Sequence, residues 1–304
     1  MPEHASRHTF CGVFVCQHFH AYLISFLILL PLATPLAAQT EQDSKYGQAE
    51  KLFSEASQLL NEGTKESLEE AIRKFLQAAP LYHEVNDTAN EAVTFNQIGL
   101  IYYSLGEMRK ALDYFLQALP LFRAVGDRRD EASTLTNIGV VYDSFGEKQK
   151  ALDYYAQALL LKRAVGDQSA EAATLNNIGS VYNSLGERHK ALDYYTQALP
   201  LSHAAGDRPN EAATLTNLGR VYSSLGETQQ ALDYYNQALP LFHALGDRRG
   251  EAVTLNNIGR VYADLGEKQK ALDCYTQSLP LYRAVGDRGG EATALANIAR
   301  SMIH

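Results

Sequence analysis

Asparagine residues recur at a fixed interval of 40 residues along most of this chain. A side-chain amide donates and accepts hydrogen bonds at once, so each asparagine can bind both polar groups of a peptide bond. Asparagine is also a mediocre helix former, and a periodic row of it needs a tertiary reason. The row indicates either a peptide-binding surface or bridges between neighbouring helices, since both uses satisfy the same groups. Its members are Asn137, Asn177, Asn217, Asn257 and Asn297, with Gln97 one interval earlier and Asn176 and Asn256 as further peptide-binding candidates.

A second row lies three residues beyond the first and changes its chemistry along the chain. It consists of Leu100, Val140, Ser180, Arg220, Arg260 and Arg300, so the cations lie in the C-terminal half. A planar guanidinium suits a carboxylate, which it can bind through two parallel N–H groups. The three arginines therefore predict a site for an acidic segment or a C-terminal carboxylate. The alternative is that Asp264 and nearby glutamates pair with them on a solvated surface.

Other residue types that carry chemistry do not form a site. The histidines His83, His189, His203 and His243 lack the HxxxH or HExxH spacing of a metal site. Cys274 stands where other repeats have tyrosine, which predicts a packed small residue rather than a nucleophile. The glycines form neither GxGxxG nor a P-loop. With 27 Lys+Arg against 35 Asp+Glu, the net charge of −8 argues against nucleic-acid binding. We therefore expect no enzyme activity, no metal, no cofactor, no nucleic-acid partner and no small-molecule substrate.

The elements that position these residues follow a strict 40-residue period. Six blocks begin with Glu-Ala, at Glu91, Glu131, Glu171, Glu211, Glu251 and Glu291. We expect an irregular repeat within 39–90 and a partial repeat or capping helix at 291–304. Five regular repeats lie between them, at 91–130, 131–170, 171–210, 211–250 and 251–290.

Each repeat predicts two helices, as the unit 171–210 illustrates. Helix A is expected over 171–185, with a buried stripe of Leu175, Ile178, Gly179, Tyr182 and Leu185. Its opposite face carries Asn176, Asn177, Ser180, Asn183 and Ser184. Gly186 ends this helix, and helix B follows with Ala191, Leu192, Tyr195, Ala198 and Leu199 at helical spacing. Pairs such as Gly166-Asp167 supply the left-handed end of one helix and the N-cap of the next. The chain therefore predicts an all-α solenoid of antiparallel helix hairpins.

Proline interrupts this pattern inside the predicted helix B. It occurs at Pro80, Pro120, Pro200, Pro240 and Pro280, and Leu160 replaces it in one repeat. An interior proline removes a backbone hydrogen bond and costs about 3 kcal/mol. We expect a kink, or a break after which the helix restarts with proline at its first position. The repeat with Leu160 indicates that the kink is not obligatory.

The repeat resembles the tetratricopeptide repeat (TPR). The residues that carry the resemblance are Leu175, Ile178, Gly179, Tyr182, Gly186, Ala191, Tyr195 and Ala198. The period of 40 differs from the usual ~34 and is similar to the TPRs of kinesin light chains and to bacterial TPR arrays that precede CHAT protease domains. The resemblance implies a right-handed superhelical solenoid. It also implies a concave groove, lined by helices A, that binds an extended peptide or a partner helix, with the asparagine row bonding the ligand backbone.

The first forty residues differ from the rest of the chain. The apolar stretch 21–36 is followed by Ala37-Ala38-Gln39. A stretch shorter than the ~20 residues of a spanning helix and ending at small residues is typical of a secretory signal peptide. We expect a signal peptide at 1–38, cleavage near Ala38, and a periplasmic or extracellular protein. The alternatives are an uncleaved membrane anchor at 21–38 and a misassigned start codon.

Three functional hypotheses follow. The first is an exported protein-protein interaction scaffold that binds a protein or peptide ligand, possibly acidic. The second is a truncated sensor or regulatory portion of a larger signalling or CHAT-type protease protein, because the final SMIH stops where the rest of a helix A is expected. The third is a self-assembling structural array, since near-identical repeats can stack end to end.

Overall fold

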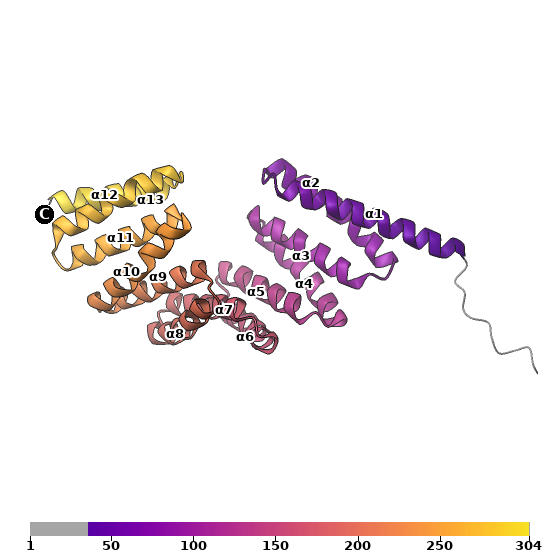
Figure 1. Cartoon of the computed structure of the whole chain (residues 1–304), viewed down its shortest axis with the longest axis horizontal. Helices are drawn as coiled ribbons and strands as arrows, with labels where there is room; N and C mark the ends of the chain where they lie inside the picture. Colours follow the sequence, from indigo (N-terminus) through magenta and orange to yellow (C-terminus); the bar gives the residue numbers. More distant parts are fainter. Residues whose placement is uncertain (1–35, 304) are drawn as a thin grey trace, which may run out of the picture. The chain divides into compact units, whose positions relative to one another are not determined.

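The computed structural model describes residues 36–303, which form thirteen helices and no strand. The chain divides into residues 1–44 and 45–304, and the repeats lie in the second unit. The helices are α1 Leu36–Leu60, α2 Lys65–Glu84, α3 Thr88–Ser104, α4 Met108–Val125, α5 Arg128–Ser144, α6 Lys148–Val165, α7 Gln168–Ser184, α8 Arg188–Ala204, α9 Arg208–Leu225, α10 Thr228–Leu245, α11 Arg248–Asp264, α12 Lys268–Ala284 and α13 Arg288–Ile303. From α2 to α13, each helix contacts the helix that follows it (Figure 1). The predicted all-α solenoid of helix hairpins is confirmed.

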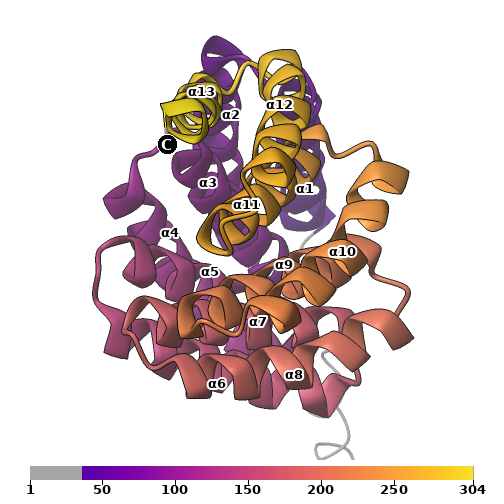
Figure 2. The ribbon, with the colours of Figure 1, turned by 90° about the vertical axis from the view of Figure 1, so that its left-hand side faces the viewer.

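Successive hairpins contact each other mainly where the second helix of one packs against the first helix of the next, and to a lesser extent through their first helices. We call α3, α5, α7, α9, α11 and α13 helices A, and α4, α6, α8, α10 and α12 helices B. Helix α7 contacts α5 and α9, and α11 contacts α9 and α13, in addition to their partners within the hairpins. Figure 2 shows that helices A and helices B alternate along residues 88–303. The surface formed by the helices A is called the A face below.

The capping residues act where the sequence predicts them. The Asp167 carboxylate accepts a hydrogen bond from the Ala170 backbone N–H at 3.0 Å and starts α7. Gly166, with φ of 70°, ends α6 in the left-handed region that favours glycine. Asp127, Asp207 and Asp247 cap α5, α9 and α11 in the same way. Each repeat therefore carries its own start and stop signals, as expected.

The predicted bounds and core stripe of helix A need two corrections. Helix α7 begins at Gln168 rather than at residue 171, because Asp167 is its N-cap. Leu185 follows the last helical residue and is 47% exposed, so it does not belong to the buried stripe. Val181 is fully buried in its place and packs with Leu175 and Ile178.

The helices with an interior proline, which are α2 and all helices B except α6, are continuous through it, so the predicted break and restart is wrong. Helix α8 runs from Arg188 to Ala204 with Pro200 inside it, and α2, α4, α10 and α12 behave alike. All five prolines are exposed. Water can therefore hydrate the backbone carbonyl that each proline leaves without its helical donor. Leu160, at the equivalent position, is also exposed.

The core is continuous from one hairpin to the next. One cluster joins Tyr155 of α6, Leu175 and Ile178 of α7, and Ala198 of α8. A second contact repeats in four of the five regular hairpins, where Tyr182 stacks on Tyr194 with ring centroids 5.4 Å apart. Equivalent stacked pairs join Tyr102 with Tyr114, Tyr142 with Tyr154 and Tyr222 with Tyr234. Each hairpin thus buries its apolar residues partly against its neighbours, as in other repeat proteins.

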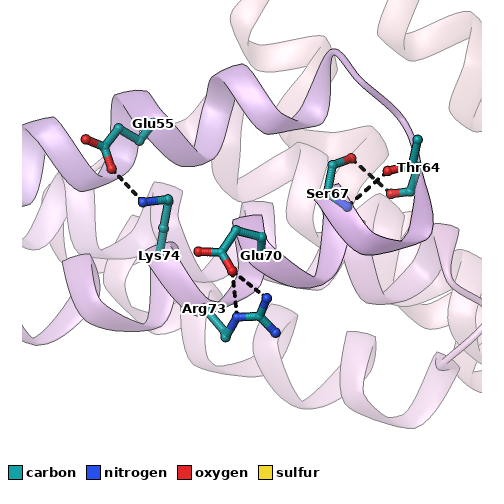
Figure 3. A network of polar contacts seen from close by, with 6 residues as sticks. All are labelled: Glu55, Thr64, Ser67, Glu70, Arg73 and Lys74. Atoms are coloured by element: carbon teal, nitrogen blue, oxygen red, sulfur yellow. Dashed lines mark hydrogen bonds and ion pairs between the residues drawn. The ribbon is translucent and has the colours of Figure 1, made fainter.

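The N-terminal hairpin is held by its own polar contacts (Figure 3). The Thr64 hydroxyl caps α2 by accepting from the Ser67 backbone N–H at 3.1 Å. The Lys74 ammonium of α2 donates to the Glu55 carboxylate of α1 at 2.6 Å, and Glu70 pairs with Arg73 within α2. These contacts give the irregular repeat a defined loop and a defined pairing of its two helices.

The predicted signal peptide and membrane anchor fall mainly on residues 1–35, outside the described part of the chain. Among the described helices, none combines the length and the apolar character needed to cross a bilayer.

Candidate functional site

The asparagine row lies along the A face. Its members belong to α5, α7, α9, α11 and α13 and are half-buried, as are Asn176 and Asn256. A helix A therefore holds each amide at the surface, with its stem packed between neighbouring helices. The structure places the predicted asparagines on one face.

Two of these asparagines bridge adjacent helices A. The Asn217 side chain of α9 donates to the Asn176 Oδ1 of α7 at 2.9 Å. In the same manner, Asn297 of α13 donates to Asn256 of α11 at 3.1 Å. Because an amide has two N–H donors and two acceptor lone pairs, such a bridge leaves polar capacity for a ligand. Bridging and ligand binding are therefore compatible at these positions.

The other three asparagines keep their amides available. Asn137, Asn177 and Asn257 make no side-chain hydrogen bond within the described residues. Half-buried amides in this state are hydrated by water, which a peptide backbone can replace without loss of hydrogen bonds. Bridged and available amides thus alternate from α7 to α13.

Polar bridges also occupy the remaining junctions between helices A. Thr134 of α5 donates to Asn96 of α3 at 3.3 Å, and the hydroxyls of Thr216 and Thr254 lie 3.4 Å apart between α9 and α11. At the junction of α5 and α7 the bridge is Lys162, described next. All five junctions from α3 to α13 therefore carry a polar contact at the same level.

Lys162 of α6 is a buried cation. Its side chain is 6% exposed, and its Nζ donates to Thr136 Oγ1 at 2.8 Å and to Thr174 Oγ1 at 2.7 Å. Burial lowers the pKa of Lys162 to about 8, and Asp167 offsets this only in part. The equivalent residues of four other repeats are the aromatic Tyr82, Phe122, Phe242 and Tyr282. Lys162 therefore replaces a core ring by a polar bridge whose ammonium is poorly solvated.

The three arginines of the second row are exposed on α9, α11 and α13. Arg220 donates to Asn217 Oδ1 at 2.9 Å, which connects the two rows on α9. Neither Asp264 nor any other described carboxylate lies within ion-pair distance of Arg220, Arg260 or Arg300. The alternative in which these arginines are neutralised by the chain's own acidic residues finds no support in the described structure.

Large rings from the helices B lie under the second row. The ring of Tyr195 lies against Gly179, where an added Cβ would be 2.7 Å from the ring atom Cε1. Only glycine permits this approach. Tyr235 lies on Gly219 in the same way. The pairs Phe115 on Gly99, Tyr155 on Gly139 and Tyr275 on Gly259 repeat this contact.

The hydroxyls of Tyr195 and Tyr235 are buried without a hydrogen-bond partner in the described structure. Burial raises the pKa of Tyr195, and the Arg220 guanidinium and Ser180 hydroxyl oppose this rise. Burial raises the pKa of Tyr235 to about 12, against the opposing effect of Arg260 and Arg220. Both phenols are therefore neutral donors near the cations of the second row.

The chemistry of the A face thus changes along the array. The second row is apolar at Leu100 and Val140, and the rings against the glycines that precede them are Phe115 and Tyr155. Further along, the row becomes polar at Ser180 and then cationic, and the rings at these positions are Tyr195, Tyr235 and Tyr275. The N-terminal half can contact apolar groups, and the C-terminal half can bind anionic oxygens.

The remaining reactive residues have structural surroundings. His83, His203 and His243 each lie beside the glutamate that opens the next repeat, with His203 Nδ1 2.8 Å from Glu211. Arg123, Arg163 and Arg283 take the same position in the other repeats. Cys274 and Tyr262 pack against the same buried cluster, and burial raises the pKa of the Cys274 thiol. The described residues contain no group of three or more potential metal ligands.

Two features of the A face went unpredicted. Lys162 could have been found by aligning the repeats, because a lysine stands among aromatic residues at that position. The change from Phe115 to tyrosine in later repeats was likewise visible, but only the structure shows that these rings lie under the second row.

The comparison with protein families identifies one repeat along the array. The model described as tetratricopeptide repeat matches residues 61–124, 90–164, 170–244 and 239–284. No curated protein sequence matches this chain.

Three solved structures of similar fold belong to proteins with different names and sources. BtubC (BKLC) from P. vanneervenii has a TM-score of 0.61 and 21% identity, covering 78% of this chain and 92% of that one. A Rap protein in complex with competence and sporulation factor has a TM-score of 0.57 and 17% identity, covering 81% and 73%. A signal transduction ATPase with a tetratricopeptide repeat sensor from Pyrococcus horikoshii has a TM-score of 0.63 and 16% identity, covering 84% and 43%. At these identities the likeness concerns the fold.

Proposed function

Because this chain belongs to the tetratricopeptide repeat family, we propose that it is a protein-protein interaction scaffold whose helices A line a groove for an extended peptide or a partner helix. The observation that carries the proposal is the asparagine row on the A face. Amides at Asn137, Asn177 and Asn257 have no described partner, and those at Asn217 and Asn297 keep spare donors and acceptors. An extended peptide has backbone groups that match such a row.

An acidic segment is the ligand class that the C-terminal half of the A face favours. Arg220, Arg260 and Arg300 are exposed there and lack a carboxylate from the described chain. A guanidinium gains most from a carboxylate that it binds through two N–H groups. The apolar Leu100 and Val140 would contact a different part of the same ligand.

The test is selection of binding peptides from a random library against the full chain. A double variant, Asn177→Ala with Asn257→Ala, should weaken a selected peptide about ten-fold, because each lost hydrogen bond contributes about 0.5–1.5 kcal/mol. Asn183→Ala is the matched control, since Asn183 lies about 120° around α7 from Asn177, at the edge of the same polar face. Selected peptides that bind the double variant as tightly as the wild type would contradict the proposal.

A sensor module within a larger signalling protein is the second candidate. It is suggested by the fold likeness to the signal transduction ATPase, of which this chain covers 43%. The expected export after cleavage near Ala38 belongs to the first candidate. Intact mass and cell fraction of the native protein separate the two, because an exported scaffold begins at Gln39 and ends at His304. A mass extending beyond His304 would favour the sensor.

A further inference from the structure

We propose that Tyr195 and Tyr235 are ligand-binding residues, which with Arg220 form a subsite for a carboxylate of the bound segment. This inference rests on the proposed function, because it concerns a ligand on the A face. It adds two donors from the helices B to a surface otherwise built from the helices A.

The position of the two hydroxyls supports this assignment. Both tyrosines are 0% exposed, and their rings are fixed against Gly179 and Gly219. The hydroxyl of Tyr195 lies near Ser180 and Arg220, and that of Tyr235 lies near Arg220 and Arg260. Arg220 therefore stands between the two phenols on the A face.

The two hydroxyls have an unmet need for an acceptor. They are the buried side-chain polar atoms of the described residues that lack a hydrogen-bond partner. A buried donor without an acceptor is costly, and native proteins satisfy most such groups. The neighbouring guanidiniums can donate to the phenol oxygens but cannot accept from the phenol O–H groups. Beside Tyr195 the Ser180 hydroxyl can accept, whereas Tyr235 is flanked by arginines alone. The acceptor missing at Tyr235 is therefore assigned to the bound segment, which can also accept from Tyr195.

A carboxylate satisfies the phenols and the arginines together. Its two oxygens offer several lone pairs, enough for a guanidinium N–H and a phenol O–H at the same time. Arg220 is exposed and is held by one described hydrogen bond, to Asn217, so its side chain can turn toward the incoming group. A neutral carbonyl would satisfy the phenol and leave the cations without a counter-charge.

The chain contains an internal control for the role of the hydroxyls. Phe115 fills the equivalent position against Gly99, beside the apolar Leu100 and Val140 of the second row. Packing of the ring on glycine therefore does not require the hydroxyl. Tyrosine occupies this position in every later regular repeat, first beside Val140 and then beside the polar and cationic members of the second row.

The experiment compares binding of fluorescent hexaglutamate and hexaglutamine, both amidated at the C-terminus, to the full chain by anisotropy. The double variant Tyr195→Phe with Tyr235→Phe should bind hexaglutamate about ten-fold or more weakly, since hydrogen bonds to charged groups are the strong ones. Hexaglutamine should change less than about two-fold, because it lacks the anion. The midpoint of thermal unfolding of the ligand-free variant should rise, because two unsatisfied hydroxyls are removed. Tyr155→Phe is the matched control, since Val140 and Ser180 flank it in place of arginines.

The outcomes separate this subsite from the general function. Unchanged hexaglutamate binding with a raised unfolding midpoint would show that the phenols are internal only and would overturn the subsite. Wild-type protein that binds hexaglutamate no more tightly than hexaglutamine would also overturn it. In either case, loss of library-selected peptides in the Asn177→Ala and Asn257→Ala double variant would leave the scaffold function intact.

Discussion

Replacing Lys162 by methionine should stabilise the protein. Methionine keeps the length of the buried stem and removes an ammonium that is 6% exposed. The fall of its pKa from 10.5 to about 8, at about 1.4 kcal/mol per pH unit, corresponds to a burial cost of about 3 kcal/mol. The hydroxyls of Thr136 and Thr174 stay satisfied in the variant, because they donate to the carbonyls of Ala132 and Ala170 at 2.9 Å. Allowing for the two lost hydrogen bonds, we expect a gain of roughly 1–3 kcal/mol at pH 7.

The stability advantage of the Lys162→Met variant should shrink as the pH rises, because the pKa of Lys162 is lowered in the folded protein. Between about pH 8 and pH 10.5 the unfolded chain keeps the Lys162 proton and the folded chain loses it. The free energy of unfolding of the wild type therefore rises with pH in this window, whereas that of the variant lacks this contribution. From pH 7 to pH 9 the difference between the two proteins should narrow by about 1 kcal/mol.

Urea unfolding followed by far-UV circular dichroism, at pH 7 and pH 9, measures this difference through the transition midpoints. Because a repeat array can unfold in parts, hydrogen exchange of α6 and α7 provides the local readout. A variant that is less stable than the wild type, with a difference independent of pH, would refute a buried and poorly solvated Lys162.

Three further substitutions test the packing of the repeats. Gly219→Ala should lower the free energy of unfolding by about 1–3 kcal/mol, because the added Cβ would lie 2.7 Å from the ring of Tyr235. Urea unfolding measures this loss, and an unchanged midpoint would contradict the close contact. Cys274→Tyr should raise the free energy of unfolding by about 0.5–1.5 kcal/mol, because the new ring can stack on Tyr262 as in the other hairpins. Thermal unfolding measures this gain, and a lower midpoint would mean that the site cannot hold the ring. Leu160→Pro should change the free energy of unfolding by less than about 1 kcal/mol, because α8 accommodates Pro200 at the same position. A proline inside a regular helix costs about 3 kcal/mol. A large loss of helical signal in circular dichroism would contradict this prediction.

The fold followed closely from local signals in the sequence. Gly166 and Asp167 end one helix and begin the next through backbone conformations and caps that depend on residue type alone. The course of the helix at each proline was harder to predict from the sequence. A continuous helix is possible there only if water can reach the backbone carbonyl that the proline leaves without a helical donor. The exposure of Pro200 decides that question, and exposure depends on the neighbouring hairpins.

The two surface rows of the candidate site were predictable from the sequence, whereas the buried residues beneath them were not. Helical periodicity places Asn177 and Arg220 on one face, because residues of one helix share a known angular relation. The contribution of Tyr195 depends on how closely a helix B approaches Gly179 of its helix A, which is a tertiary property. Lys162 stands out in an alignment of the repeats, but its role as a bridge is a tertiary property, since its partners Thr136 and Thr174 belong to two different helices.

Hydrogen exchange of the full chain with and without a library-selected peptide tests the central claim most directly. Binding along the A face predicts slower exchange in α5, α7, α9 and α11, with little change in the exposed turns of α6, α8 and α10. Local protection of this kind reports the elements whose opening the ligand suppresses. Protection confined to the helices B, or to α12 and α13 alone, would contradict a ligand site formed by the asparagine row.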